Sequence, residues 1–197
     1  AGNIGGGGFM LVRTKDGNAT VIDFRETAPA KSTRDMFLDD SGNVSDKNIN
    51  GHLSVGVPGT VAGFSKALEL FGKKKLKEVL KPAIKLAERG FVIDRRLESN
   101  LEWYKDAMLQ FPPTAKIFAP KGTLLLEGET FRQPDLAATL KRIQKFGSDD
   151  FYRGKTAKLI VDEMKRGGGI ITLEDLKNYK VEIRQPVEGM YRGYKIL

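Results

Sequence analysis

The chain has 197 residues, 40% of them hydrophobic, which is enough for a buried core and excludes a disordered tail. No apolar run approaches the roughly 20 residues that a helix needs to span a bilayer. The absence of cysteine excludes a thiol nucleophile, and the single histidine, His52, excludes a histidine-rich metal cluster or a Ser-His-Asp triad. The net charge of +8 invites a nucleic-acid interpretation, but the lysines are spread at ordinary helical spacing, which favours a solvated basic face and no nucleic-acid partner.

Four consecutive glycines at positions 5–8 precede an apolar stretch, and Asp16-Gly17 separates this stretch from a second one, "TVIDF". The pattern predicts a β-hairpin over residues 4–24. The glycines match no phosphate-binding loop, because a strand rather than a helix follows them. We expect them to let another segment of main chain pass close by.

Arg25 comes directly after the second strand of this hairpin and is followed by Glu26. An arginine at a strand end presents a planar fork that can bind a carboxylate through two hydrogen bonds, with Glu26 or Asp23 to hold it in place. The alternative is an ordinary surface ion pair. The polar segment that follows, residues 32–53, is predicted to be a surface loop that contains His52, to which we assign no role.

Helical patterns occupy the middle of the chain. Thr60 is the predicted N-cap of a helix ending before Gly72, and "GVPGTVAG" around it predicts a closely packed helix entry. Pro82 predicts two short helices in place of one over residues 76–89. A helix over residues 95–111 is expected to end at Pro112, and short extended pieces to follow it over residues 117–133.

Two further helices are predicted over residues 134–147 and 149–169, the second beginning with "FYRG" as an aromatic anchor. Thr172 and Asp175 stand at capping-box spacing for a short last helix, and single strands over residues 180–187 and 190–197 close the chain. Strands at both ends with helices between them predict an α+β architecture whose sheet continues beyond this chain.

The ordered motifs "GNIGGGGFML", "IDFRETAPAK", "TRDMFLD", "VGVPGTVAGF", "PAIKLAERGF", "QPDLAATL", "FYRGKTA", "GGGIIT", "EDLKNY" and "YRGY" extend over essentially all 197 residues. In this order they resemble the γ-glutamyltranspeptidases, glutathione hydrolases of the N-terminal-nucleophile superfamily, and most closely the bacterial periplasmic members. The individual motifs are short, but their number and order make the resemblance specific.

The resemblance implies a precursor that cuts itself into a large and a small subunit, which remain together as a heterodimer in an αββα sandwich. Residues 1–197 then form an incomplete large-subunit segment of a single domain. The nucleophile is a threonine at the new N-terminus of the small subunit, so no catalytic residue is expected in this chain. A signal peptide upstream of Ala1 and a periplasmic or secreted location are also implied.

In this family the arginine of the R-E-x-A-P motif binds the α-carboxylate of the γ-glutamyl donor, and Arg25 is the matching position, with Glu26 as the residue that orients it. The implied substrates are glutathione and other γ-glutamyl compounds, with water, amino acids or dipeptides as acceptors. No metal or cofactor is implied. Two alternatives stay open: a related acylase or poly-γ-glutamate-processing enzyme, and a noncatalytic binding protein on the same scaffold.

Overall fold

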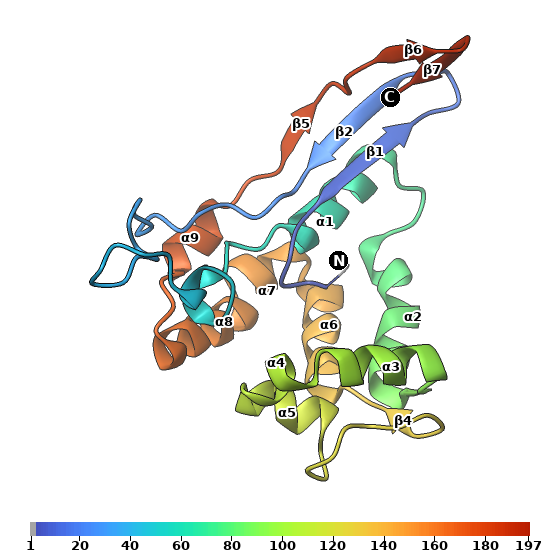
Figure 1. Cartoon of the computed structure of the whole chain (residues 1–197). Coiled ribbons are helices and arrows are strands. Elements are labelled where there is room, and N and C mark those ends of the chain that lie inside the picture. The colour runs from blue at the N-terminus through green and yellow to red at the C-terminus, as the bar shows by residue number, and fades with distance from the viewer. Residues whose placement is uncertain (1–2) are drawn as a thin grey trace. The chain divides into compact units, whose positions relative to one another are not determined.

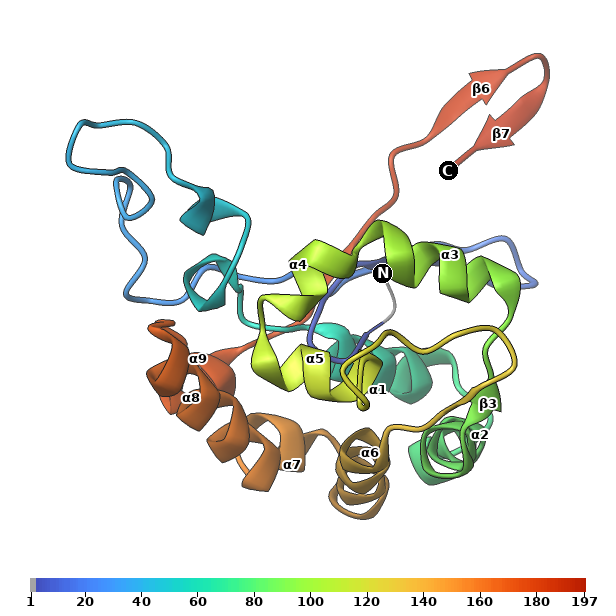
Figure 2. The same cartoon turned by 60° about the horizontal axis from the view of Figure 1, so that its bottom comes forward.

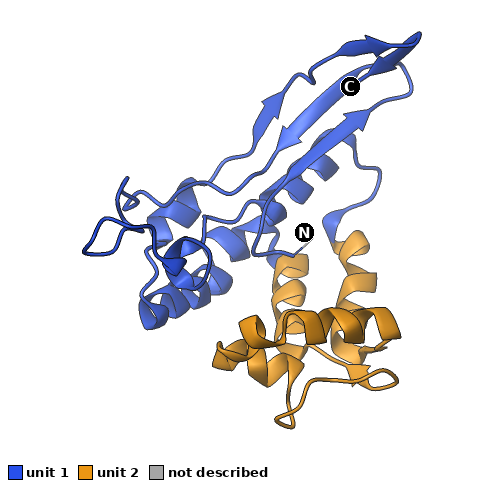
Figure 3. Ribbon diagram, viewed as in Figure 1, with its two compact units in different colours: residues 1–76, 146–197 blue, residues 77–145 orange. Residues whose placement is uncertain are grey.

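The computed structural model describes residues 3–197, which form two compact units (Figure 3). Unit 1 comprises the chain up to residue 76 together with residues 146–197, and unit 2 comprises residues 77–145. Unit 2 is therefore an insertion in the sequence of unit 1. Within the described residues, no helix combines the length and the apolar character that a membrane crossing requires.

The sheet of unit 1 has three antiparallel strands in the order β1-β2-β5, with the bounds Phe9–Arg13, Ala19–Asp23 and Glu182–Arg184 (Figure 1). The predicted N-terminal hairpin is confirmed, and Gly17 at its turn has a φ of 92°, a value that glycine adopts without strain. Ile22, on the central strand, is fully buried. The sheet thus combines the N-terminal hairpin with strand β5 from the C-terminal part of the chain.

The other elements of unit 1 are mostly helical: 3-10 turns η1 and η2 at Asp46–Asn48 and His52–Ser54, and helices α1, α7, α8 and α9 at Thr60–Phe71, Ser148–Tyr152, Lys155–Gly167 and Leu173–Asn178. The capping box of Thr172 and Asp175 is confirmed, because each side chain accepts a hydrogen bond from the other's backbone N–H. The single helix predicted over residues 149–169 is wrong, since Arg153 and Gly154 interrupt it.

Thr60 is not an N-cap, contrary to the prediction. It is the first residue of α1 and is buried, and Gly59 takes the cap position. The N–H groups of Gly59 and Thr60 both donate to the carbonyl oxygen of Gly6, at 2.9 and 3.0 Å. Main chain from the glycine run therefore satisfies the helix start that a side chain was expected to cap.

The C-terminal segment forms a hairpin and not the single strand predicted over residues 190–197. Strands β6 and β7, Gly189–Tyr191 and Tyr194–Ile196, pair through a turn in which Arg192 and Gly193 have positive φ values of 49° and 82°. Figure 2 shows this hairpin standing clear of helices α7–α9. Alternating residues are compatible with a single strand or with a hairpin. Here the turn at "RG", residues 192 and 193, makes the segment a hairpin.

Unit 2 is built mainly of helices: α2, α3, α4, α5 and α6 at Leu76–Arg89, Arg95–Trp103, Lys105–Leu109, Pro112–Phe118 and Pro134–Phe146, with strands β3 and β4 at Phe91–Val92 and Thr130–Phe131. Its core contains Ile93, Leu101 and Phe131. The helix predicted over residues 134–147 is confirmed.

Two predictions for unit 2 are wrong. Helix α2 passes through Pro82 without dividing, because Ile84 and Ala87 beyond the proline are buried and hold the second half in place. The helix predicted over residues 95–111 breaks at Tyr104 into α3 and α4, and Pro112 opens α5 as its first residue. Proline is well suited to that position, since its missing N–H has no partner in the first turn.

Candidate functional site

A pocket of about 580 Å³ lies where strand β2 ends, and every residue around it belongs to unit 1. It is lined by Gly5, by residues 25–29, by four residues between 32 and 37, and by residues 53–56. The two residues predicted from the sequence, Arg25 and Glu26, are both in its wall. The pocket is thus formed by the strand end and the long loop that follows it.

The main chain at Arg25 is held on both sides. Gly8 and Phe24 exchange two backbone hydrogen bonds of 3.2 and 2.9 Å, which extends the β1–β2 pairing to the last residue before Arg25. The N–H of Arg25 donates to Asp23 Oδ1 at 3.1 Å, and its carbonyl oxygen accepts from the Tyr179 hydroxyl at 2.8 Å. The backbone from which the guanidinium projects is therefore fixed.

The Arg25 side chain is 64% exposed, and its Nε lies 3.6 Å from Glu26 Oε2. Among the described residues, Glu26 is the only carboxylate within ion-pair distance of this guanidinium. The guanidinium carbon also lies 5.9 Å from the centre of the Phe9 ring. Because Glu26 contacts Nε, the two terminal nitrogens of the fork are the groups that a ligand carboxylate would meet.

Asp23, the other expected partner of Arg25, binds a different arginine. Its Oδ2 accepts a hydrogen bond of 2.7 Å from Nε of Arg184 on strand β5. Partial burial alone would raise the pKa of Asp23, but the hydrogen bonds from Arg184 and from the Arg25 N–H outweigh that effect and lower it. Asp23 thus stays ionised and joins the strand end to β5.

Gly7 and Gly56 pack closely against Glu26. A Cβ added at Gly7 would lie 2.8 Å from Glu26 Oε2 and 2.5 Å from the Phe24 carbonyl oxygen, and one added at Gly56 would lie 2.8 Å from Glu26 Cβ. Carbon atoms do not approach so closely without displacing something. The prediction that the glycine run lets main chain pass close by is confirmed at Gly7, which makes room for the main chain of Phe24 and Glu26.

The loop after Glu26 is anchored at two points. Thr27 and Val57 exchange backbone hydrogen bonds of 3.3 and 2.8 Å, and the N–H of Ala30 donates to Asp175 Oδ1 at 2.8 Å. Asp175 is also the N3 residue of the α9 capping box, so one carboxylate serves both the helix and the loop. The spacing of the capping box predicted the first role and carried no signal for the second.

Two tyrosines donate hydroxyl hydrogen bonds to main-chain carbonyl groups next to the pocket, those of Pro58 and Arg25. Their rings, Tyr152 and Tyr179, stack with centres 5.6 Å apart, and the Tyr152 hydroxyl donates to the Pro58 carbonyl oxygen at 2.9 Å. Burial, and then the charges of Asp23 and Glu26, raise the pKa of Tyr179 to about 12, so it remains a hydrogen-bond donor at neutral pH. A Cβ at Gly59 would lie 2.0 Å from the Tyr179 oxygen, which confirms the closely packed helix entry.

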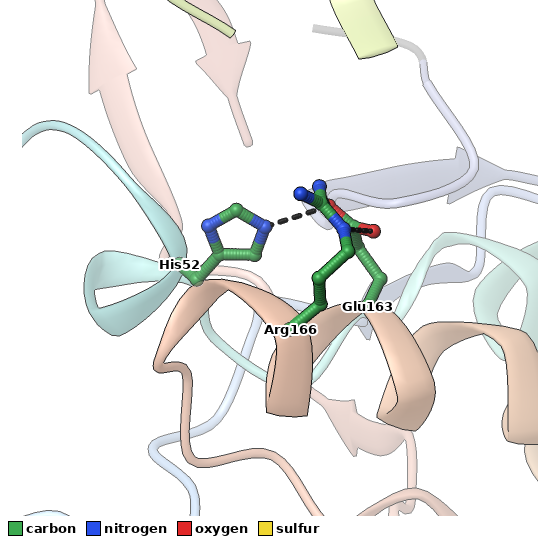
Figure 4. Close-up of polar contacts among 3 residues, drawn as sticks. All are labelled: His52, Glu163 and Arg166. Carbon is green, nitrogen blue, oxygen red and sulfur yellow. Dashed lines mark hydrogen bonds and ion pairs between the residues drawn. The ribbon is translucent and has the colours of Figure 1, made fainter. Parts of the chain in front are cut away.

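His52, which had no predicted role, is part of a polar cluster next to the pocket wall (Figure 4). Its Nε2 lies 2.7 Å from Glu163 Oε1, and Nε of Arg166 donates to Glu163 Oε2 at 2.8 Å. The hydrogen bonds from Arg166 and His52 lower the pKa of Glu163 to about 2. A contact across 111 positions has no signature in the spacing of a single sequence.

A family model described as gamma-glutamyltranspeptidase matches residues 1–197. The chain belongs to the γ-glutamyltranspeptidase family. It is 50% identical to the glutathione hydrolase proenzyme of Escherichia coli (strain K12), over 100% of the chain and 34% of the proenzyme. This segment of a γ-glutamyltranspeptidase therefore spans about a third of the length of that curated relative.

The crystal structure of Helicobacter pylori gamma-glutamyltranspeptidase matches with a TM-score of 0.97 and 48% identity, over 100% of this chain and 57% of that one. The predicted α+β fold, part of an N-terminal-nucleophile hydrolase sandwich, is thereby confirmed. The acylase ACY 1 proenzyme of Pseudomonas sp. (strain SE83) is 40% identical, over 98% of the chain and 36% of that proenzyme. The relatives of this chain therefore include a protein named as an acylase.

Proposed function

We propose that this chain is the donor-binding segment of the large subunit of a γ-glutamyltransferase and glutathione hydrolase. The observation that carries the proposal is the position of Arg25, fixed through its main chain and presented to a pocket of about 580 Å³. Membership of the γ-glutamyltranspeptidase family supports it. The rest of the enzyme then includes a small subunit made from the same precursor.

Arg25 binds the free α-carboxylate of the γ-glutamyl group in this proposal. That carboxylate distinguishes a γ-linked glutamyl donor from an ordinary glutamyl residue of a peptide, in which the α-carboxyl is an amide. Two parallel hydrogen bonds from one guanidinium fix both its position and its orientation. Glu26 keeps the fork in place through Nε, 3.6 Å from its Oε2.

The reaction is acyl transfer from glutathione or another γ-glutamyl compound. The N-terminal threonine of the small subunit attacks the γ-carbonyl carbon, its own α-amino group takes the hydroxyl proton, and the amine of the donor leaves with a proton. Water, an amino acid or a dipeptide then releases the glutamyl group. This chain holds the donor still while the partner subunit reacts with it. A periplasmic or secreted location belongs to the same proposal.

The test uses the complete, processed protein with a γ-glutamyl anilide as donor. Arg25→Ala is expected to raise KM roughly 30-fold or more, because losing one partner of a hydrogen-bonded charge pair that the bound donor covers costs about 2–5 kcal/mol. Arg25→Lys should recover part of the loss, since an ammonium keeps the charge without the fork. Arg34→Ala removes a guanidinium that is 96% exposed in the same loop and serves as the control.

A donor analogue makes the test specific for the carboxylate. A 4-aminobutyryl anilide is the γ-glutamyl donor without its α-carboxylate, so wild type should discriminate strongly against it. Arg25→Ala should abolish this discrimination by slowing the γ-glutamyl donor alone. An unchanged ratio between the two donors in Arg25→Ala would refute the role of Arg25.

The acylase relative supports a second candidate function, a change of acyl group on the same scaffold. A glutaryl anilide keeps the carboxylate and lacks the α-amino group. Turnover of the glutaryl donor at a rate equal to or above that of the γ-glutamyl donor would favour the acylase. If neither donor reacts and glutamate does not bind, the noncatalytic binding protein remains.

A further inference from the structure

The segment 53–56 lines the pocket together with the strand end that carries Arg25. At its C-terminal end it continues into Val57, which pairs with Thr27 through two backbone hydrogen bonds. At its N-terminal end stands His52, whose ring reaches helix α8. The wall is therefore a short span fixed at both ends.

The N-terminal end of this segment, at His52, is held by a hydrogen bond to a carboxylate and by close packing. Glu163 accepts from both His52 and Arg166, so its carboxylate is shared between an imidazole and a guanidinium (Figure 4). The His52 side chain is only 19% exposed. Charge-assisted hydrogen bonds of this kind are stronger than neutral ones, particularly where water is partly excluded.

Two glycines at and just after the C-terminal end of α8 pack against His52. A Cβ at Gly167 would lie 2.1 Å from His52 Nδ1 and 2.2 Å from two further ring atoms, and one at Gly169 would lie 2.8 Å from the His52 carbonyl oxygen. Gly167 is the last residue of the helix, where alanine would otherwise be preferred. Gly167 thus has a packing reason, which is the imidazole, whereas Gly169 packs against the main chain of His52 and the sulfur of Met164.

We propose that His52 is a positioning residue for the donor pocket: held by Glu163 and by Gly167, it fixes residues 53–56 as a preformed wall of the pocket that Arg25 and Glu26 also line. The inference rests on the proposed function and adds a residue to it. Gly56 lies against Glu26, so a shift of the wall is transmitted to the carboxylate that orients Arg25. A loosened wall weakens donor binding and leaves the chemical step unchanged.

The experiment uses the complete, processed enzyme and two readouts, donor kinetics and amide hydrogen exchange. His52→Ala and Glu163→Ala should each raise KM for a γ-glutamyl anilide roughly tenfold with kcat unchanged, as expected when a hydrogen bond to a charged group is lost. Exchange should accelerate over residues 52–57 and not in helix α1. His52→Gln keeps a hydrogen-bond donor near the position of Nε2, so both the donor KM and the exchange over residues 52–57 should return part of the way to wild-type values.

A second route to the same state displaces the ring without removing a charge. Gly167→Ala should reproduce the effects of His52→Ala, because its methyl group occupies the place of the imidazole. In the His52→Ala background the same substitution should add little, so the two effects are not additive. Asp162→Asn, which changes the neighbouring carboxylate of α8, is the matched control and should leave both readouts at wild-type values.

Three results would overturn the proposal. Unchanged exchange over residues 52–57 in His52→Ala and Glu163→Ala would show that the segment is fixed otherwise, and evenly accelerated exchange over unit 1 would reduce His52 to a general stabilising contact. Faster local exchange with an unchanged KM would separate the wall from donor binding. If wild type neither binds glutamate nor cleaves the donor, the proposed function fails instead, and the exchange readout still decides whether His52 fixes the segment.

Discussion

The Tyr179 hydroxyl donates a hydrogen bond of 2.8 Å to the main-chain carbonyl oxygen of Arg25, 154 positions earlier in the sequence. Its ring is stacked on Tyr152, which is in turn bonded to Pro58 at the entry of helix α1. The orientation of a residue at the pocket is therefore set by an aromatic pair from the C-terminal third of the chain. A guanidinium can discriminate between ligands only if its own backbone does not move.

Removing the Tyr179 hydroxyl tests this support. Tyr179→Phe should lower the free energy of unfolding by about 1 kcal/mol, because one hydrogen bond is lost while the stacked ring remains. KM for the γ-glutamyl donor should rise moderately and kcat should stay constant. Urea unfolding and steady-state kinetics of the complete protein measure both. Tyr104→Phe, at a tyrosine that is 59% exposed, is the control, and equal effects of the two changes would contradict the support assigned to Tyr179.

The role of the glycine run can be tested by alanine substitution at Gly7, with the neighbouring Gly8 as the control. Gly7→Ala should destabilise the protein by about 1–3 kcal/mol, the usual cost of overpacking, because its Cβ would lie 2.5 Å from the Phe24 carbonyl oxygen and 2.7 Å from the Glu26 nitrogen. Gly8→Ala should be close to neutral, since its nearest contact is at 3.4 Å. Thermal unfolding of the two variants measures the difference, which disappears if the glycines serve only as a flexible link.

Asp175 performs two tasks that substitution can separate. Thr172→Ala removes the cap of α9 and should cost about 1 kcal/mol of stability with an unchanged donor KM. Asp175→Ala removes the other half of the capping box, the bonds that its carboxylate accepts from Thr172, and also the hydrogen bond from Ala30, so it should cost more stability and raise KM. A donor KM that responds equally to both variants would show that the loop after Arg25 does not depend on Asp175.

The stability contributed by Glu163 should depend on pH. Its pKa falls from an ordinary value of 4.5 to about 2, through the hydrogen bonds from Arg166 and His52. A depressed carboxyl pKa stabilises the fold above the unfolded pKa, and this contribution is lost as the pH falls from about 4.5 towards 2. The advantage of wild type over Glu163→Gln should therefore shrink between pH 6 and about pH 3, by an amount that water screening keeps modest at a side chain 41% exposed.

Urea unfolding at a series of pH values provides the measurement. A pH-independent difference between wild type and Glu163→Gln would mean that the ion pair with His52 and Arg166 does not persist in solution. In that case the hydrogen bond from His52 to Glu163 could not account for the proposed positioning role of His52.

Local patterns in the sequence determined the hairpin, the capping box of α9 and the position of Arg25 at a strand end. Each of these depends on residues within a few positions of one another, where turn geometry, caps and alternation act. The sequence of motifs also determined the family. The same local reasoning was wrong at Thr60 and Pro82, where the surrounding structure satisfied a helix start or buried a helix end and so overrode the local preference.

The tertiary structure alone decided what holds the pocket together. Tyr179 at Arg25, Asp175 at Ala30 and Glu163 at His52 are pairs separated by 154, 145 and 111 positions. Hydrogen bonds act over about 3 Å, so such pairs exist only once helices α8 and α9 have packed beside the strand end. The sequence placed Arg25 at the end of a strand, and the packing of distant elements determined how firmly its main chain is held.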